Sequence, residues 1–125
     1  MNGTKSRRAG SDIADIKGEV MSEAQEQIAV MRWAEMQSNK YPELKLLFHI
    51  PNGSNKSKAQ AGLFKAMGLK SGVPDLFLPV ARQCYHGLFI EMKTKKGVLS
   101  ASQKWWLTEL KKQGYMTSVA KGFDE

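Results

Sequence analysis

The segment PDLFLPVARQCYHGLFIEMKT, residues 74–94, contains two apolar runs separated by a short polar stretch. Each run has the length and the aliphatic and aromatic content of a β-strand, and the polar ARQC at 81–84 is expected to form the turn between them. The first run, PDLFLPV, is apolar almost throughout, which is typical of a strand buried on both faces. We therefore predict an antiparallel hairpin at the centre of the fold.

The register of this hairpin brings charged residues together. If the turn is centred near Gln83, paired residues have numbers that sum to about 166, and Asp75 then lies opposite Glu91. Strand alternation places Lys93 on the same face as Glu91. Because facing carboxylates repel each other unless a cation lies between them, and because such oxygen ligands suit magnesium or manganese, the pattern predicts a metal site.

An ordinary explanation exists for the same three residues, namely a solvated strand end with an incidental Glu-Lys pair. Spacing alone supports both interpretations equally. However, Glu91 lies within the apolar run LFIEM, where an unpaired charge would be costly, and this favours a functional site. Lys93 could orient or help deprotonate a water molecule, or offset negative charge on a phosphate. These are the requirements of phosphodiester hydrolysis.

Further helices and strands flank the hairpin. Ser22 with Gln25 and Ser100 with Gln103 have the spacing of capping boxes, each ahead of a run of helix-forming residues. The predicted order is helix, strand, helix, the two paired strands, helix and strand, which is a mixed α/β fold. Outside the hairpin, the expected elements are a helix over 23–37, a strand over 45–51, a helix over 56–67 stopped by Gly68, a helix after Ser100 stopped by Gly114, and a strand over 115–120.

The composition fits one domain that binds a polyanion. The 125 residues suit a single compact unit, predicted over 22–125 and preceded by a flexible basic arm at 1–21. A formal net charge of +7 favours nucleic acid over a membrane surface. The lone Cys84 excludes an internal disulfide and a multi-cysteine zinc site. Because neither a signal peptide nor a transmembrane segment is recognised, we expect a cytoplasmic protein, in the host cytoplasm if the source is viral.

Several other polar residues remain open to two interpretations. Glu26 shares a helical stripe with Val30 and Trp33, and the sequence alone favours a boundary residue with its carboxylate in water. Glu23, by contrast, is expected on the solvated surface. Gln103 lies on the stripe that should face the sheet, and either a capping role or an active-site role explains it. His49 is expected to be structural or hydrogen-bonding, with the possibility of approaching the carboxylates across the sheet.

Lysines surround the predicted acids in the chain. Phosphate positioning is a reasonable role for them, and ordinary solvated lysines are the alternative. The candidates for DNA contact are Lys56, Lys58, Lys70, Lys95 and Lys96.

The segments GVPDLFLP at 72–79 and FIEMKTKKGVLSASQKWW at 89–106 resemble the PD-(D/E)XK nuclease pattern. More specifically, they resemble the virus-type replication-repair nuclease family, VRR-NUC, and its stand-alone phage-type members. The pair Glu26-Gln27, HIPNG at 49–53 and GLKSGVPD at 68–75 fit the same family. The resemblance extends from the first helix onward and is far more specific than a PD or an ExK match alone.

This resemblance implies a restriction-endonuclease-like αβββαβ core, with an extra helix between the first and second strands. It also implies Mg²⁺ as the cofactor, with Mn²⁺ able to substitute. The implied metal ligands are Asp75, Glu91 and the main-chain carbonyl of Met92, with Glu26 as a possible further ligand. Lys93 matches the catalytic lysine, Glu26 the acid of the first helix, and Gln103 the glutamine that follows the ExK strand.

The activity implied by the resemblance is that of a metal-dependent DNA endonuclease in replication, recombination or repair. Family members resemble Holliday-junction resolvases, so branched DNA and a homodimer are expected. The alternatives are a non-catalytic basic DNA-binding module on a nuclease fold, a flap nuclease or another structure-specific nuclease. A sequence-specific restriction enzyme is disfavoured because no separate recognition domain is recognised.

Overall fold

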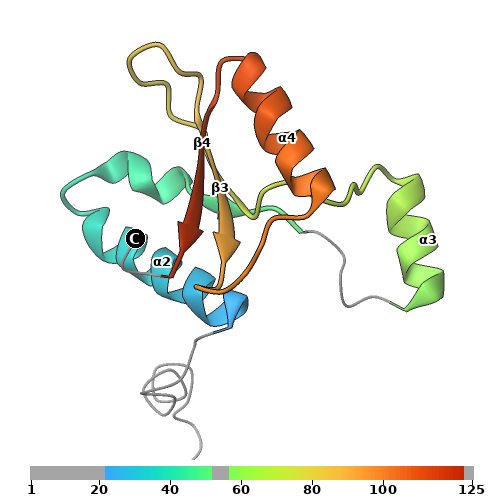
Figure 1. Cartoon of the computed structure of the whole chain (residues 1–125). Coiled ribbons are helices and arrows are strands. Elements are labelled where there is room, and N and C mark those ends of the chain that lie inside the picture. The colour runs from blue at the N-terminus through green and yellow to red at the C-terminus, as the bar shows by residue number, and fades with distance from the viewer. Residues whose placement is uncertain (1–21, 52–56, 123–125) are drawn as a thin grey trace, which may run out of the picture.

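The computed structural model describes residues 22–51 and 57–122 (Figure 1). The predicted arm at 1–21, the Asn52-Gly53 turn and Lys56 lie outside the described residues. The chain order is a helix, a 3-10 helix, a strand, a helix, two strands, a helix and a strand. The elements are α2 (Glu23–Gln37), η1 (Pro42–Leu46), β1 (Phe48–His49), α3 (Lys58–Ala66), β2 (Leu76–Leu78), β3 (Leu88–Lys93), α4 (Ala101–Lys112) and β4 (Met116–Lys121).

The four strands form one mixed sheet in the order β1-β2-β3-β4. Strands β2 and β3 are antiparallel, and their pairs include Leu76 with Ile90 and Leu78 with Leu88, which confirms the predicted register. Strands β3 and β4 are parallel because α4 carries the chain back across the sheet between them. The predicted α/β fold, with its extra helix between the first two strands, is confirmed.

Each of the described α-helices begins with a reciprocal capping box. Ser22, Ser57 and Ser100 each accept a hydrogen bond from the backbone N–H three residues later. The side-chain oxygen of the glutamine at that position accepts one from the serine backbone N–H. Two of the three boxes were predicted from their spacing; that of Ser57 was not. Helix α4 stops where expected, since Gly114 has a φ of 94° and the ring of His86 occupies the space that a Cβ would need.

The predicted strand over 45–51 is largely wrong. Residues Pro42–Leu46 form a 3-10 helix, and only Phe48–His49 pair with β2. Pro42 favours a helical first turn because its fixed φ suits that position, and this signal outweighs the apolar run that follows. The strand predicted over 74–80 is also longer than the observed one, because only Leu76–Leu78 pair with neighbouring strands.

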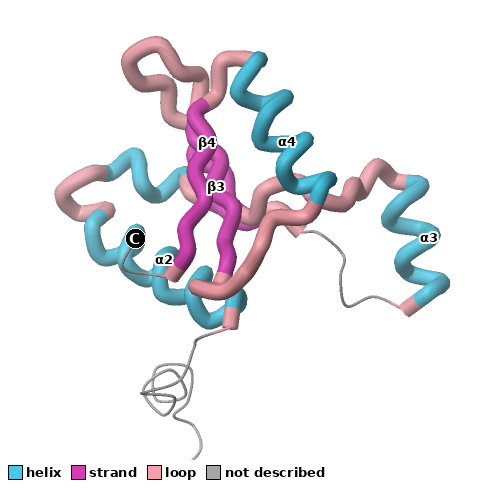
Figure 2. The backbone as a smooth tube through the Cα atoms, in the orientation of Figure 1, coloured by secondary structure: helices cyan, strands magenta, loops and turns pink. Residues whose placement is uncertain are grey.

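The core lies between α2 and one face of the sheet. Ala34 of α2 packs with Leu47, Leu76 and Met92, which are all buried. Strand alternation turns Glu91 to the opposite face, where α4 covers the sheet (Figure 2). The acid therefore lies between the sheet and α4. Among the described residues, no helix is long and apolar enough to cross a membrane.

Candidate active site

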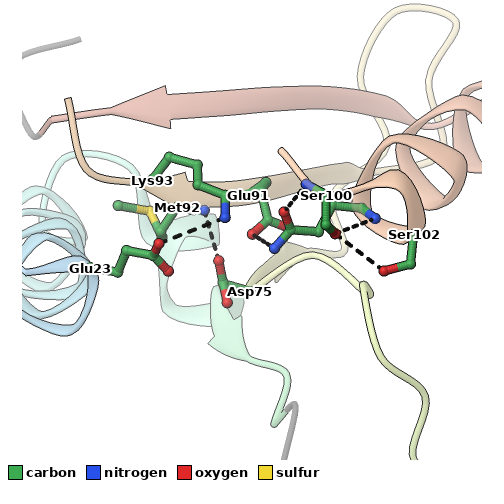
Figure 3. A network of polar contacts seen from close by, with 8 residues as sticks. Glu23, Asp75, Glu91, Met92, Lys93, Ser100 and Ser102 are labelled. Carbon is green, nitrogen blue, oxygen red and sulfur yellow. Dashed lines mark hydrogen bonds and ion pairs between the residues drawn. The ribbon is translucent and has the colours of Figure 1, made fainter. Parts of the chain in front are cut away.

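Asp75 lies immediately before β2, between the fully buried Pro74 and Leu76. Its side chain is buried, and its Oδ2 accepts a hydrogen bond of 2.7 Å from the main-chain N–H of Met92 on β3 (Figure 3). The ladder register, continued by one step, puts Asp75 beside Glu91. The sheet itself thus brings together the two carboxylates that the sequence predicted to be neighbours.

Glu91 is the most deeply buried acid of this group, with 2% of its surface exposed. Burial, together with the nearby negative charge of Asp75, raises the pKa of Glu91 from 4.5 to about 8, while Lys93 opposes the shift. Its Oε1 has no hydrogen-bond partner among the described residues. At neutral pH the metal-free site therefore retains a proton that a cation could replace.

Gln103 has both of the roles that the sequence left open. Its Oε1 accepts a hydrogen bond from the backbone N–H of Ser100, which completes the cap of α4. Its Nε2 donates to Glu91 Oε2 over 3.1 Å. The same amide therefore joins the start of α4 to the buried acid and fixes the rotamer of that acid.

Lys93 is 9% exposed and faces the same site (Figure 3). Its Nζ lies 3.7 Å from Oε2 of Glu23 on the first turn of α2. The expectation that Glu23 lies on the solvated surface is confirmed, but its ion pair with the predicted catalytic lysine was not anticipated. Residues that are 70 positions apart meet only because α2 packs across the end of β3, and no local pattern reveals this.

Glu26 is 3% exposed, so the boundary position favoured by the sequence alone is wrong. One of its oxygens, Oε1, is buried without a hydrogen-bond partner in the described part of the chain. Its Oε2 lies 3.9 Å from where a Cβ on Gly122 would be. Helix α2 thus contributes a second buried acid, and the role that the family resemblance implies for Glu26 stays a prediction.

His49 contacts the main chain of Asp75. Its Nδ1 lies 3.0 Å from the carbonyl oxygen of Asp75 and 3.0 Å from Nε2 of Gln27. A neutral ring protonated at Nδ1 would donate to the carbonyl, whereas the other tautomer would accept from Gln27. Either way, β1 and α2 support the segment that carries Asp75. The contact with Gln27 spans 22 residues and was not anticipated.

The donor set fits a hard divalent cation. Glu91 and Glu26 each have a buried carboxylate oxygen without a hydrogen-bond partner among the described residues, and a cation could replace the proton that the raised pKa of Glu91 retains. Within residues 22–51 and 57–122, no three His, Cys, Asp or Glu side chains gather into a ready metal cluster. Magnesium commonly takes one or two carboxylates and completes its shell with water, so Asp75 and Glu91 suffice as anchors. Ligation by Asp75, Glu91, Glu26 or the Met92 carbonyl stays a prediction.

The candidate lysines occupy three places. Lys95 and Lys96 lie exposed in the loop after β3, Lys70 is exposed in the loop before β2, and Lys58 is exposed at the start of α3. Lys95 packs its aliphatic stem near Gly122. Their contact with phosphate stays a prediction.

Comparisons with known proteins agree with this arrangement. The VRR-NUC domain family matches residues 21–124. A solved structure described as a VRR_NUC domain protein is similar, with a TM-score of 0.72 and 37% sequence identity, over 85% of this chain and 82% of that one. No curated protein matches the sequence.

Proposed function

Because the chain belongs to the VRR-NUC family, and so has a nuclease domain of the PD-(D/E)XK type for which DNA is the implied substrate, we propose that it is a metal-dependent DNA endonuclease. The proposed cofactor is Mg²⁺, with Mn²⁺ able to substitute. The observation that carries the proposal is the buried pair Asp75 and Glu91, in which Glu91 has a pKa raised to about 8 and one oxygen without a hydrogen-bond partner in the described part of the chain. Such a pair is costly for the fold unless a cation uses it.

When bound at these carboxylates, the cation would supply Lewis-acid polarisation of a phosphoryl oxygen and lower the pKa of a coordinated water. The protein residues then have separate tasks. Asp75 is held by the Met92 N–H and Glu91 by the Gln103 amide, so both acids keep their orientation without substrate. Lys93 presents its ammonium group beside them, where it offsets charge on the attacked phosphate or orients the attacking water.

We propose further that the substrate is branched DNA and that the enzyme works as a homodimer. Support comes from the resemblance to stand-alone family members, since two symmetry-related sites suit two symmetry-related strands. The net charge of +7 and the exposed Lys70, Lys95 and Lys96 would favour approach of the phosphate backbone.

The decisive assay gives the purified protein, with and without magnesium, four labelled substrates: a four-way junction, a flap, a single strand and a linear duplex. We expect magnesium-dependent cleavage of the junction in symmetric pairs, abolished in Glu91→Gln and Lys93→Ala with binding retained. Glu35→Gln, which changes an exposed acid of α2, is the matched control and should cut normally. Binding of DNA without cleavage of any substrate would instead identify a non-catalytic DNA-binding module.

A further inference from the structure

Helix α3 stands away from the sheet and from the other helices (Figure 1). Of its nine residues, only Phe64 is half-buried, and all the others are exposed. A helix this short gains little from its own hydrogen bonds and usually depends on packing for its stability. Most of the surface of α3 is therefore available to another molecule.

The charged residues of α3 and of the loop that follows it are all positive. Residues 57–74 include three lysines and no acid. Lys58 and Lys65 are seven positions apart, so they lie within about 20° of each other around the helix axis. Lys58, Lys65 and Lys70 are all exposed and form no ion pair with any residue that the structure describes. This face matches a row of negative charges.

The loop between α3 and β2 is anchored to α4 (Figure 2). The indole Nε1 of Trp106 donates to the carbonyl oxygen of Ser71 over 3.1 Å. Gly72, with a φ of 88°, lies so close to Ser102 that a Cβ would be 2.7 Å from its hydroxyl. The fully buried Pro74 then leads into Asp75. Because of these contacts, α3 projects from a fixed point beside the candidate active site.

We propose that α3 binds the phosphate backbone of the DNA duplex that flanks the cleaved bond, with Lys58 and Lys65 contacting the same strand. Seven residues of helix span about 10 Å, and phosphates of one strand advance about 3.4 Å along the duplex at each step. The two ammonium groups therefore match phosphates about three steps apart. The proposal rests on the proposed nuclease function and adds to it a requirement for duplex on one side of the cut.

The opposite face of α3 offers a different kind of contact. Leu63 and Met67 are 59% and 70% exposed and lie one helical turn apart, roughly opposite Lys58. An apolar pair of this kind would suit a second copy of the chain. We assign the helix to DNA because its charge is uniformly positive and because the loop that follows it leads directly into Asp75. Docking of a second copy of the chain is one of the outcomes of the test.

The test compares the wild-type protein with Lys58→Ala/Lys65→Ala, using Lys111→Ala/Lys112→Ala at the far end of α4 as the charge-matched control. Two measurements are made: equilibrium binding to a labelled duplex without magnesium at several salt concentrations, and cleavage kinetics with magnesium. For the α3 variant we expect the salt slope of log K to fall by about 2 and KM to rise roughly tenfold, with kcat unchanged. We expect the control to show neither change.

Each contrary result has a distinct meaning. An unchanged salt slope in the α3 variant, or an equal loss in the control, would overturn the role of α3. Normal DNA binding by the lysine variant, combined with a lower mass in solution for Leu63→Ser/Met67→Ser, would show that α3 docks on a second copy instead. If the wild type binds DNA but cleaves nothing, the nuclease proposal fails, while the binding measurement still decides the α3 proposal.

Discussion

Glu91 combines near-complete burial with a raised pKa, and the effect of this combination on stability can be measured. Because its pKa is about 8 in the fold and 4.5 in the unfolded chain, the folded state binds the proton more tightly between these values. The free energy of unfolding of the metal-free protein should therefore decrease as pH rises through this window, by on the order of 1 kcal/mol per pH unit.

The variant Glu91→Gln cannot lose this proton, yet it keeps an oxygen that can accept from Gln103. We expect it to be more stable than the wild type without metal, by a margin that grows from pH 5 to pH 8 in urea unfolding. Glu35→Gln should show no such margin, since that acid is exposed. A constant difference between Glu91→Gln and the wild type across this range would refute the buried, proton-binding state of Glu91.

We expect Glu23 to position Lys93, because its carboxylate forms an ion pair with that lysine at 3.7 Å and forms no hydrogen bond with Asp75 or Glu91. We expect Glu23→Gln to lower kcat roughly three- to tenfold with KM unchanged, since the lysine loses its orientation while the DNA surface is kept. Stopped assays over a range of DNA concentrations separate the two constants. Glu23→Asp, which retains the charge on a shorter side chain, should recover part of the loss, and a rise in KM alone would argue against this role.

The capping box of α4 is an element that serves both folding and the site, because Gln103 caps the helix and donates to Glu91. Ser100→Ala removes the hydroxyl that accepts from the Gln103 backbone. We expect it to lower the free energy of unfolding by about 1 kcal/mol and also to lower kcat, since the Gln103 amide becomes less constrained.

Ser57→Ala is the matched control for this element, because Ser57 forms the same reciprocal box on α3. We expect a similar loss of stability from Ser57→Ala, with kcat unchanged. Thermal unfolding and single-turnover cleavage measure the two quantities. Equal effects of the two substitutions on kcat would show that the α4 cap contributes only to folding.

At the level of elements, the sequence patterns predicted helices better than strands. Capping boxes and helix-stopping glycines are local signals, so α2 begins at Glu23 and ends at Gln37 as predicted. Strand lengths depend on which neighbours supply hydrogen bonds. For that reason the strands predicted from the apolar runs at 45–51 and 74–80 are longer than β1 and β2 in the structure. The predicted register between β2 and β3 is confirmed.

At the scale of the whole molecule, the part of the candidate site that lies within one hairpin was predicted, and the part that depends on packing between distant elements was not. Asp75, Glu91 and Lys93 belong to one hairpin, so alternation and register were enough to bring them together. The contacts of Glu23 with Lys93 and of Gln27 with His49 depend on the angle at which α2 crosses the sheet. Burial of Glu26 depends on the same packing and was indicated only by the family resemblance.

The central claim is that the buried acids of the sheet form a divalent cation site, and calorimetric titration with Mn²⁺ tests it without relying on cleavage. Repeating the titration at pH 7 in buffers of different ionisation enthalpy counts the protons released. With a pKa of about 8 for Glu91, binding should release about 0.9 proton per site. Glu91→Gln should bind weakly and release none, and Asp75→Asn should bind weakly. Binding to the wild type without proton release, or equal binding by Glu91→Gln, would contradict the account.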